Sequence, residues 1–258
     1  MSTAIIVSGS LRQLVNASSS WTIPGDYYLI VDQNTYNTAD LTVVGNSFEQ
    51  LADNIRQCHV KFVTVSVVID NNLSDNIRHH TTINMINKWR QAYYAVLPYT
   101  VNRTYDKVIL LRPDCYLNGK QPLKLLLDTP FEDDTVYSTT ELINKHHDQW
   151  GDRLIMNDVL LMFNWTTFNR FVNELLPYYI ENYNLTQQQG YEVHTMLAKF
   201  CKERNFKVTN HVANYFDFAI LRNTSELMFA YGSLMPNYSF NNLLEAEQLW
   251  WKNTYGKN

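Results

Sequence analysis

The stretch Lys107-Val108-Ile109-Leu110-Leu111-Arg112-Pro113-Asp114 decides the fold class of this chain. Its apolar run predicts a short buried strand, and Arg112-Pro113-Asp114 predicts the turn that ends the strand. The same arrangement occurs near the start of the chain, where Ala4 to Val7 is followed by Ser8-Gly9-Ser10. It occurs again at Tyr27 to Val31, before another polar turn. Continuous apolar runs of this kind are typical of strands in a parallel sheet that is covered on both faces.

Helical patterns alternate with these strands. Asn46 and Glu49 resemble a capping box and predict a helix from about 47 to 58, followed by a strand at 60–69. An apolar stripe from Met85 to Val96 predicts a second helix that Pro98 ends. Further elements are predicted as strands at 135–137 and 159–163, a helix at 168–176 that ends near Pro177, and a helix at 193–201.

This alternation predicts an α/β fold with a mostly parallel central sheet flanked by helices. Residues 1–115 read as repeated βαβ units, and residues 116–258 are mixed, with longer loops. No repeat, low-complexity tract or linker divides the chain, so we predict a single domain over 1–258.

Composition excludes several classes of protein. The chain has 258 residues, 45% hydrophobic and 14% aromatic, which excludes disorder. Its 8 glycines form neither a GxGxxG nor a GxxxxGK[ST] motif, so a bound nucleotide must be held by side chains, a metal or ordinary turns. The 3 cysteines are scattered and predict neither a disulfide framework nor a CxxC zinc site.

Charge and hydropathy bear on the partners. The formal net charge is −4, which does not favour strong nonspecific attraction to nucleic acid. No apolar stretch approaches the roughly 20 residues of a membrane span, and the N-terminal run at 4–7 is too short for a signal peptide. We therefore expect no membrane partner and a cytoplasmic location, which means the host cytoplasm if the protein is viral.

The polar residues that follow the predicted strands are the candidate site, because ligands of open α/β sheets bind beyond the carboxyl ends of the strands. Arg12 suits a phosphate through its planar fork. Asp32 suits the hydroxyls of a ribose or a base edge, and Asp114 suits a hard cation. Purely structural roles stay open as alternatives: a surface ion pair for Arg12, and a turn residue or helix cap for Asp114.

The segment Tyr105 to Asp114 resembles the part of small GT-A-fold glycosyltransferases, of the viral and bacterial type, that carries their DxD-like motif. Ile5 to Arg12 resembles the first strand and turn of that family, and the helix with Lys88 resembles the one before the motif strand. Asn157-Asp158 resembles its ND segment. Glu192 resembles an acidic helix start and Phe218 to Arg222 a closing strand, so the resemblance spans most of residues 4–222.

The resemblance implies a GT-A-like domain that transfers a sugar from a nucleotide-diphosphate sugar, of the UDP-sugar type, to a hydroxyl. Residues 1–115 would bind the donor and residues 116–258 the acceptor. Asp158 would be the general base, and Asp114 would bind Mn²⁺ or Mg²⁺, with His211 or His194 completing the metal shell. The implied donor-binding residues are Ser8, Gly9, Arg12, Asp32, Lys88 and Arg112.

One departure from the family pattern concerns the metal. Arg112 stands where a full DxD motif has its first carboxylate, so only Asp114 remains of the acidic pair. The metal requirement is therefore open, and Arg112 is expected to do part of the work of a metal ion. A reduced motif also favours a second class of function, a non-catalytic GT-A-like module that binds a sugar or a protein.

The acceptor side is less defined. The polar and aromatic segment 132–151 predicts an acceptor-side wall or a lid, in which Trp150 is positioned to stack on a sugar or base, and Glu192 is assigned to the same side by resemblance. The acceptor is either a glycan or a hydroxymethylated base of phage DNA. A nucleotidyltransferase, which would cleave between phosphates, is a third alternative.

Overall fold

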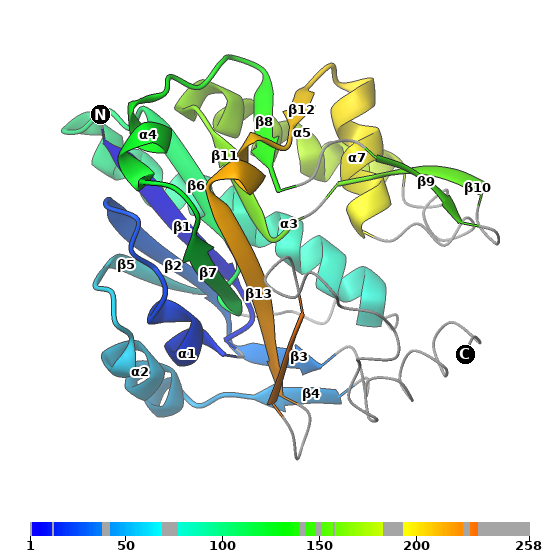
Figure 1. Cartoon of the computed structure of the whole chain (residues 1–258). Helices are drawn as coiled ribbons and strands as arrows, with labels where there is room; N and C mark the ends of the chain where they lie inside the picture. The colour runs from blue at the N-terminus through cyan, green and yellow to red at the C-terminus, as the bar shows by residue number, and fades with distance from the viewer. Residues whose placement is uncertain are drawn as a thin grey trace.

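The computed structural model describes residues 2–11, 13–37, 42–68, 77–139, 143–147, 151–156, 158–182, 193–223 and 228–231. Its centre is a seven-stranded sheet in the order β12-β8-β11-β6-β1-β2-β5 (Figure 1). The strands are β1 (Thr3–Gly9), β2 (Asp26–Asp32), β5 (Phe62–Val68), β6 (Lys107–Leu111), β8 (Thr135–Ser138), β11 (Leu160–Phe163) and β12 (Lys207–Thr209). Only β11 runs antiparallel to its neighbours. The predicted α/β class with a mostly parallel sheet is confirmed, and the arrangement is compatible with a Rossmann-like fold.

Two layers cover the sheet (Figure 1). One layer holds the helices α3 (Ile77–Val96), α5 (Trp165–Glu181) and α7 (Val193–Glu203). The other holds α1 (Leu14–Ser18), α2 (Phe48–Gln57), α4 (Leu123–Asp128) and an antiparallel sheet of β7 (Cys115–Gly119), β13 (Phe216–Asn223) and β14 (Met228–Tyr231). The alternation along β1 shows how both layers are used: Ala4 and Ile6 face the first layer, whereas Ile5 and Val7 face the second.

The smaller elements are two hairpins and two short helices. The hairpins pair β3 (Asn34–Asn37) with β4 (Thr42–Gly45), and β9 (Ile143–His147) with β10 (Gly151–Ile155). The short 3₁₀ helices are η1 (Leu97–Val101) and η2 (His211–Asn214). In the described part of the chain, no helix combines the length and hydrophobicity needed to cross a bilayer.

The predicted cap of α2 is wrong by one residue. Ser47 caps the helix, accepting a bond from the Gln50 amide at 3.1 Å, and the Gln50 side chain accepts one from the Ser47 amide at 2.8 Å. Asn46 instead donates its side-chain amide to the Gln33 carbonyl at 3.0 Å. Asn46 therefore ties the start of α2 to the end of β2, and the next residue is left to cap the helix.

The predicted end of α5 near Pro177 is also wrong, because the helix continues through this proline to Glu181. A proline inside a helix costs about 3 kcal/mol, since it lacks an amide donor and its ring crowds the preceding turn. Tyr178 and Tyr179 follow it and are both buried in the core. Burying two aromatic side chains recovers free energy of the same order, so the helix persists.

The topology gives the sheet two functionally different edges. We call the edge where β1, β2, β6 and β8 end, and where β11 begins, the carboxyl edge, and the opposite one the amino edge. Residues from both halves of the chain meet at the carboxyl edge, because β8 and β11 belong to the same sheet as β1, β2 and β6.

Candidate active site at the carboxyl edge of the sheet

The turn after β1 joins its two neighbours at the carboxyl edge. Gly9 has φ +151°, and a Cβ there would lie 2.8 Å from Cδ of Pro113, so the turns after β1 and β6 are in direct contact. Ser10 Oγ donates to Asp32 Oδ2 at 3.4 Å, which joins the turn after β1 to the end of β2. Strands in a sheet lie about 4.8 Å apart, so the ends of β6 and β2 are about 10 Å from each other. This is a compact site assembled from three strands.

Asp32 forms a buried ion pair with Lys88 of α3. Lys88 Nζ lies 2.5 Å from Asp32 Oδ2, and the two side chains are 4% and 1% exposed. Tyr28 and Ile30 face the α3 layer, and Asp32, two residues further along the same strand, faces it too. The sequence interpretation gave both residues to the donor site, and the structure brings them into contact. A carboxylate as deeply buried as that of Asp32 needs an opposite charge beside it. The contact with Lys88 therefore allows a carboxylate to lie at this edge of the sheet.

A second group of charges follows β6 and precedes β11. Arg112 donates from Nε to Asp114 Oδ1 and from Nη2 to Asp114 Oδ2, both at 2.9 Å, in a bidentate pair. Its Nη1 lies 3.6 Å from Asp158 Oδ2. Asp114 and Asp158 are 1% and 5% exposed. One guanidinium therefore bridges two buried carboxylates that are distant in the sequence.

His194 adds an imidazole to this group. Its Nδ1 lies 3.5 Å from Asp158 Oδ1 and 3.2 Å from the Met156 carbonyl, and its side chain is 37% exposed. The Met156 amide donates to the His194 carbonyl at 3.1 Å, which fixes the first turn of α7 beside the segment that leads to Asp158. We call Arg112, Asp114, Asp158 and His194 the Arg112 cluster. Sequence reasoning considered His194 only as a metal ligand, because no motif links it to Asp158.

Buried polar atoms without hydrogen bonds to described residues collect at this edge. They are Ser8 Oγ in β1, Thr139 Oγ1 after β8, Asp158 Oδ1 before β11 and His211 Nε2 after β12. Each such atom costs about 1–3 kcal/mol if nothing satisfies it, so proteins rarely keep them without a reason. Within the described part of the chain, four of them lie along one sheet edge, which supports this edge as the candidate site.

The structure brings together most, but not all, of the predicted site residues. Ser8, Gly9, Asp32, Lys88, Arg112, Asp114 and Asp158 all lie at the carboxyl edge or on α3 beside it. His211 follows β12, with β8 and β11 between that strand and β6, and its ring contacts Tyr137 and Tyr215. Arg12, Trp150 and Glu192 lie outside the described residues.

The described residues do not fit the Mn²⁺ or Mg²⁺ site implied by Asp114 and His211. Both carboxylate oxygens of Asp114 accept bonds from Arg112, and His211 is placed three strand positions away. Within the described ranges, no three His, Cys, Asp or Glu side chains form a group suited to a metal ion. Among the described residues, the Arg112 guanidinium is a cation in direct contact with Asp114, and it can do part of the work of a metal ion.

Cys115, next to Asp114, is not a nucleophile in this arrangement. Burial raises the pKa of its thiol well above the ordinary value of 9.0, and the neighbouring Asp114 carboxylate raises it further. The thiol therefore stays protonated, and Cys115 packs in the core from β7, where it pairs with Ile220 of β13.

Comparison with known proteins adds no family to this geometry. No protein-family model matches the chain, and the curated proteins contain no match to it.

Proposed function

We propose that this protein is a glycosyltransferase that moves a sugar from a nucleotide-diphosphate sugar, of the UDP-sugar type, to a hydroxyl acceptor. The observation that carries the proposal is the carboxyl edge itself. There, the Asp32–Lys88 pair and the Arg112 cluster lie about two strands apart, beside buried polar atoms that have no hydrogen bond to the described residues. Ligands of open α/β sheets bind at this edge, and the resemblance of 105–114 to the DxD segment supplies the reaction class.

The residues at this edge have the chemistry that sugar transfer requires. Asp32 and Lys88 form a buried pair at the end of β2, beside which the donor nucleoside would bind. The turn at Ser8 and Gly9 lies between the two charged groups, where the diphosphate would cross the end of β1. Negative charge develops on the departing diphosphate, and a preorganised guanidinium such as Arg112 stabilises it.

Thermal stabilisation by nucleotide sugars tests this proposal. The panel is UDP, UDP-glucose, UDP-galactose, UDP-N-acetylglucosamine and GDP-mannose, each with and without Mn²⁺. A ligand at a hundred times its dissociation constant adds about 2.7 kcal/mol to the free energy of unfolding. We expect a clear stabilisation by at least one UDP-sugar, and loss of that stabilisation in Arg112→Ala.

Arg170→Ala is the matched control, because Arg170 also bridges two carboxylates but lies at the amino edge. This variant should unfold more easily without losing its response to the ligand. If no nucleotide or nucleotide sugar stabilises the wild type, the proposal is wrong.

One observation favours a second candidate, a non-catalytic domain that binds a sugar nucleotide. The Asp114 carboxylate is fully engaged by Arg112, as in a structural ion pair. Release of UDP from the stabilising UDP-sugar separates the two candidates: the enzyme should release it slowly without an acceptor, and Asp114→Asn should release less. Stabilisation without any release would favour the binding domain.

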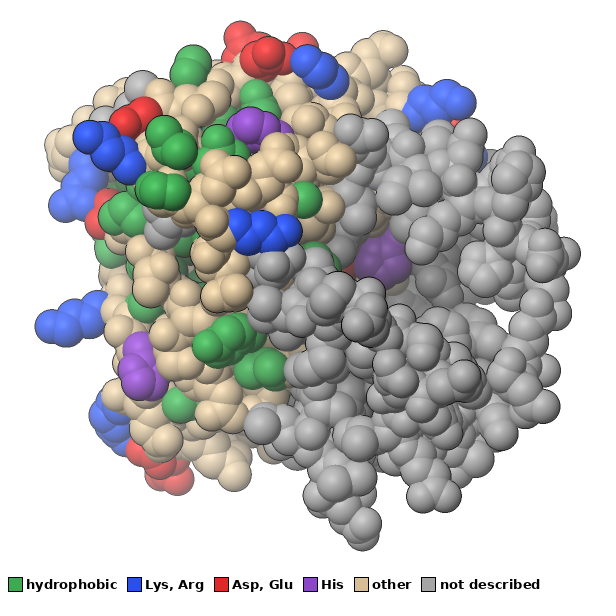
Figure 2. Space-filling model, viewed as in Figure 1, with side chains coloured by type: hydrophobic (Ala, Val, Ile, Leu, Met, Phe, Trp, Pro, Cys, Tyr) green, Lys and Arg blue, Asp and Glu red, His purple; other side chains and the backbone are tan. Residues whose placement is uncertain are grey.

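The charge of the protein bears on the choice of acceptor. In the described part of the face shown in Figure 2, basic and acidic side chains are interspersed and do not merge into one basic surface. With a net charge of −4, this favours a glycan over duplex DNA as the acceptor. A salt-dependent affinity for duplex DNA would reverse this assignment.

A further inference from the structure

His194 and Asp158 form a pair whose geometry goes beyond the roles assigned above. We propose that His194 takes the proton from the acceptor hydroxyl and that Asp158 is the positioning residue behind it; this inference rests on the proposed glycosyl transfer. Asp158 is 5% exposed, whereas the His194 side chain is 37% exposed. Of the two groups, the imidazole is therefore the one that an acceptor can reach.

The neighbours of Nδ1 determine the tautomer of the ring. Nδ1 lies 3.2 Å from the Met156 carbonyl oxygen, which can only accept a hydrogen bond. Asp158 Oδ1 lies 3.5 Å from the same nitrogen and, as a carboxylate, is also an acceptor. Nδ1 therefore carries the proton, and Nε2 is left with a free lone pair. Among the described residues, Nε2 has no hydrogen-bond partner.

Arg112 explains why Asp158 supports a base and does not act as one. Its Nη1 lies 3.6 Å from Asp158 Oδ2, so a cation faces one oxygen while His194 faces the other. With Asp114 included, one positive and two negative groups leave the cluster with a single surplus negative charge. This charge favours the imidazolium that forms when Nε2 takes a proton, as the carboxylate does in a Ser-His-Asp triad.

The step balances as a single displacement. The acceptor oxygen forms a bond to the anomeric carbon of the sugar, and its proton goes to Nε2 of His194. The bond between that carbon and the diphosphate oxygen breaks, and the electron pair leaves with the nucleoside diphosphate, whose charge Arg112 faces. The imidazolium then returns its proton to water. A displacement of this kind inverts the configuration at the anomeric carbon.

Kinetics of two variants test the role of His194. With the UDP-sugar from the panel that binds best and its transfer product as the readout, His194→Gln should lower kcat about 10²–10⁴-fold while the donor still stabilises the protein. His194→Gly should regain part of its rate when free imidazole is added, which a purely structural role would not allow. His59→Gln is the matched control, since His59 lies beside α1 and α2, away from the cluster.

Histidine NMR separates this inference from the proposed function. In ¹⁵N-labelled wild-type protein at neutral pH, His194 should show the tautomer with the proton on Nδ1, and Asp158→Asn should reduce its population. A proton on Nε2, a retained kcat in His194→Gln, or retention of configuration would overturn the inference even if transfer occurs. If the wild type transfers sugar from no donor of the panel, the proposed function fails, and the role of His194 fails with it.

Discussion

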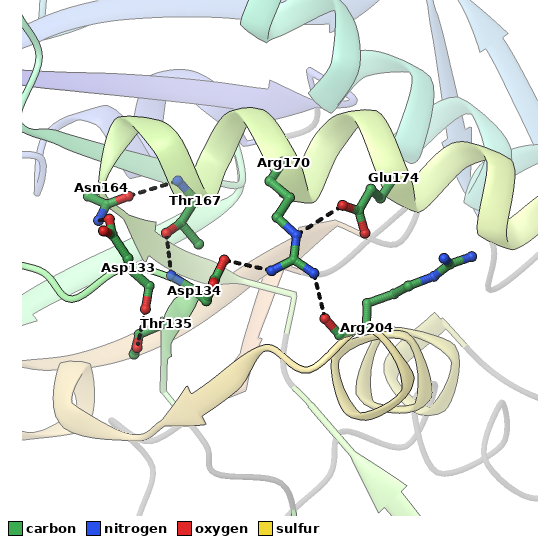
Figure 3. Close-up of polar contacts among 8 residues, drawn as sticks. All are labelled: Asp133, Asp134, Thr135, Asn164, Thr167, Arg170, Glu174 and Arg204. Atoms are coloured by element: carbon green, nitrogen blue, oxygen red, sulfur yellow. Dashed lines mark hydrogen bonds and ion pairs between the residues drawn. The ribbon is translucent and has the colours of Figure 1, made fainter.

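Two groups of charges, one at each edge of the central sheet, differ in how deeply they are buried. At the amino edge, Arg170 donates to Asp134 at 2.6 Å, to Glu174 at 2.9 Å and to the Arg204 carbonyl at 2.7 Å (Figure 3). Its guanidinium also lies 4.5 Å from the ring centre of Phe206. These groups are partly exposed. At the carboxyl edge, Asp32, Asp114 and Asp158 are buried, and buried polar atoms beside them lack bonds to described residues.

The difference in burial distinguishes an edge whose charges stabilise the fold from an edge that carries the candidate site. At the amino edge, Arg170 and its partners are hydrogen-bonded and partly exposed. Water can replace part of each bond, so the loss of one bond costs the fold little stability. At the carboxyl edge, buried charges lie beside polar atoms that lack bonds to described residues, and buried polar groups cost stability unless they are paired. Departures from good local bonding are expected at functional sites, and here they gather at one edge.

The largest contrast should come from removing one cation at each edge. Lys88→Met leaves the buried Asp32 carboxylate without its ion pair, and breaking such a pair costs about 3–5 kcal/mol. Arg170→Met should cost clearly less, because its carboxylate partners are 57% and 35% exposed and water replaces the bonds. Chemical denaturation measures both values. Asp32→Asn in the Lys88→Met background should recover much of the loss, and equal costs at the two edges would contradict the comparison.

Gly9→Ala should have the next largest effect. An alanine at φ +151° is strained by about 1–3 kcal/mol, and its Cβ would meet the ring of Pro113 at 2.8 Å. The free energy of unfolding should fall by this amount, and stabilisation by the UDP-sugar should weaken because the turns after β1 and β6 move apart. Adding Pro113→Ala should remove the clash but not the backbone strain. An unaltered ligand response in Gly9→Ala would mean that this turn is not part of the site.

A smaller effect is expected at the amino edge from Asn164→Ala. The Asn164 side chain caps α5 by accepting from the Thr167 amide at 2.8 Å and donates to Asp133 at 2.7 Å (Figure 3). Losing a cap of this kind costs about 1 kcal/mol. Thermal unfolding should show the loss, Asn164→Ser should restore most of it, and the stabilisation by the UDP-sugar should stay the same. A changed ligand response would show that the two edges are coupled.

The smallest effect is expected from Asp26, at the amino edge, on how the free energy of unfolding changes with pH. Burial opposes ionisation of this carboxyl, but hydrogen bonds from Tyr105 and Arg103 outweigh it and hold the pKa below its ordinary value of 3.8. The folded pKa is lowered, so the stabilisation is present above 3.8 and is lost as pH falls through the folded value. Asp26→Asn should therefore be less stable than wild type at neutral pH, and the difference should shrink below pH 3.8. A constant difference would contradict this assignment.

The sequence predicted the fold better than it predicted the local caps and ends. Apolar runs such as Ala4 to Val7 are buried on both faces, so they identify strands without any tertiary information. The cap of α2 and the end of α5 were missed because contacts from elsewhere decided them: Gln33 binds Asn46, and the core accommodates Tyr178 and Tyr179.

The candidate site divides in the same way. Asp32 and Asp114 were identified because each follows an apolar run, at the edge where ligands of an α/β sheet bind. Asp158 was identified through the resemblance of Asn157-Asp158 to the ND segment of a glycosyltransferase family. The pairing of these carboxylates was not predicted: the Asp158–His194 contact, for example, joins the segment before β11 to α7 and leaves no pattern along the chain.

The amino-acid sequence by itself determined the alternating elements, the parallel sheet and the positions of the acidic residues, because periodicity and turn residues act over a few neighbouring positions. Only the tertiary structure decided which charges meet. Arg112 lies between two carboxylates, and Lys88 lies against Asp32, because the order of strands and the packing of α3 bring distant segments together. The electrostatic energy of such a pair depends on the distance between its charges and on their burial, and the spacing of residues along a chain determines neither.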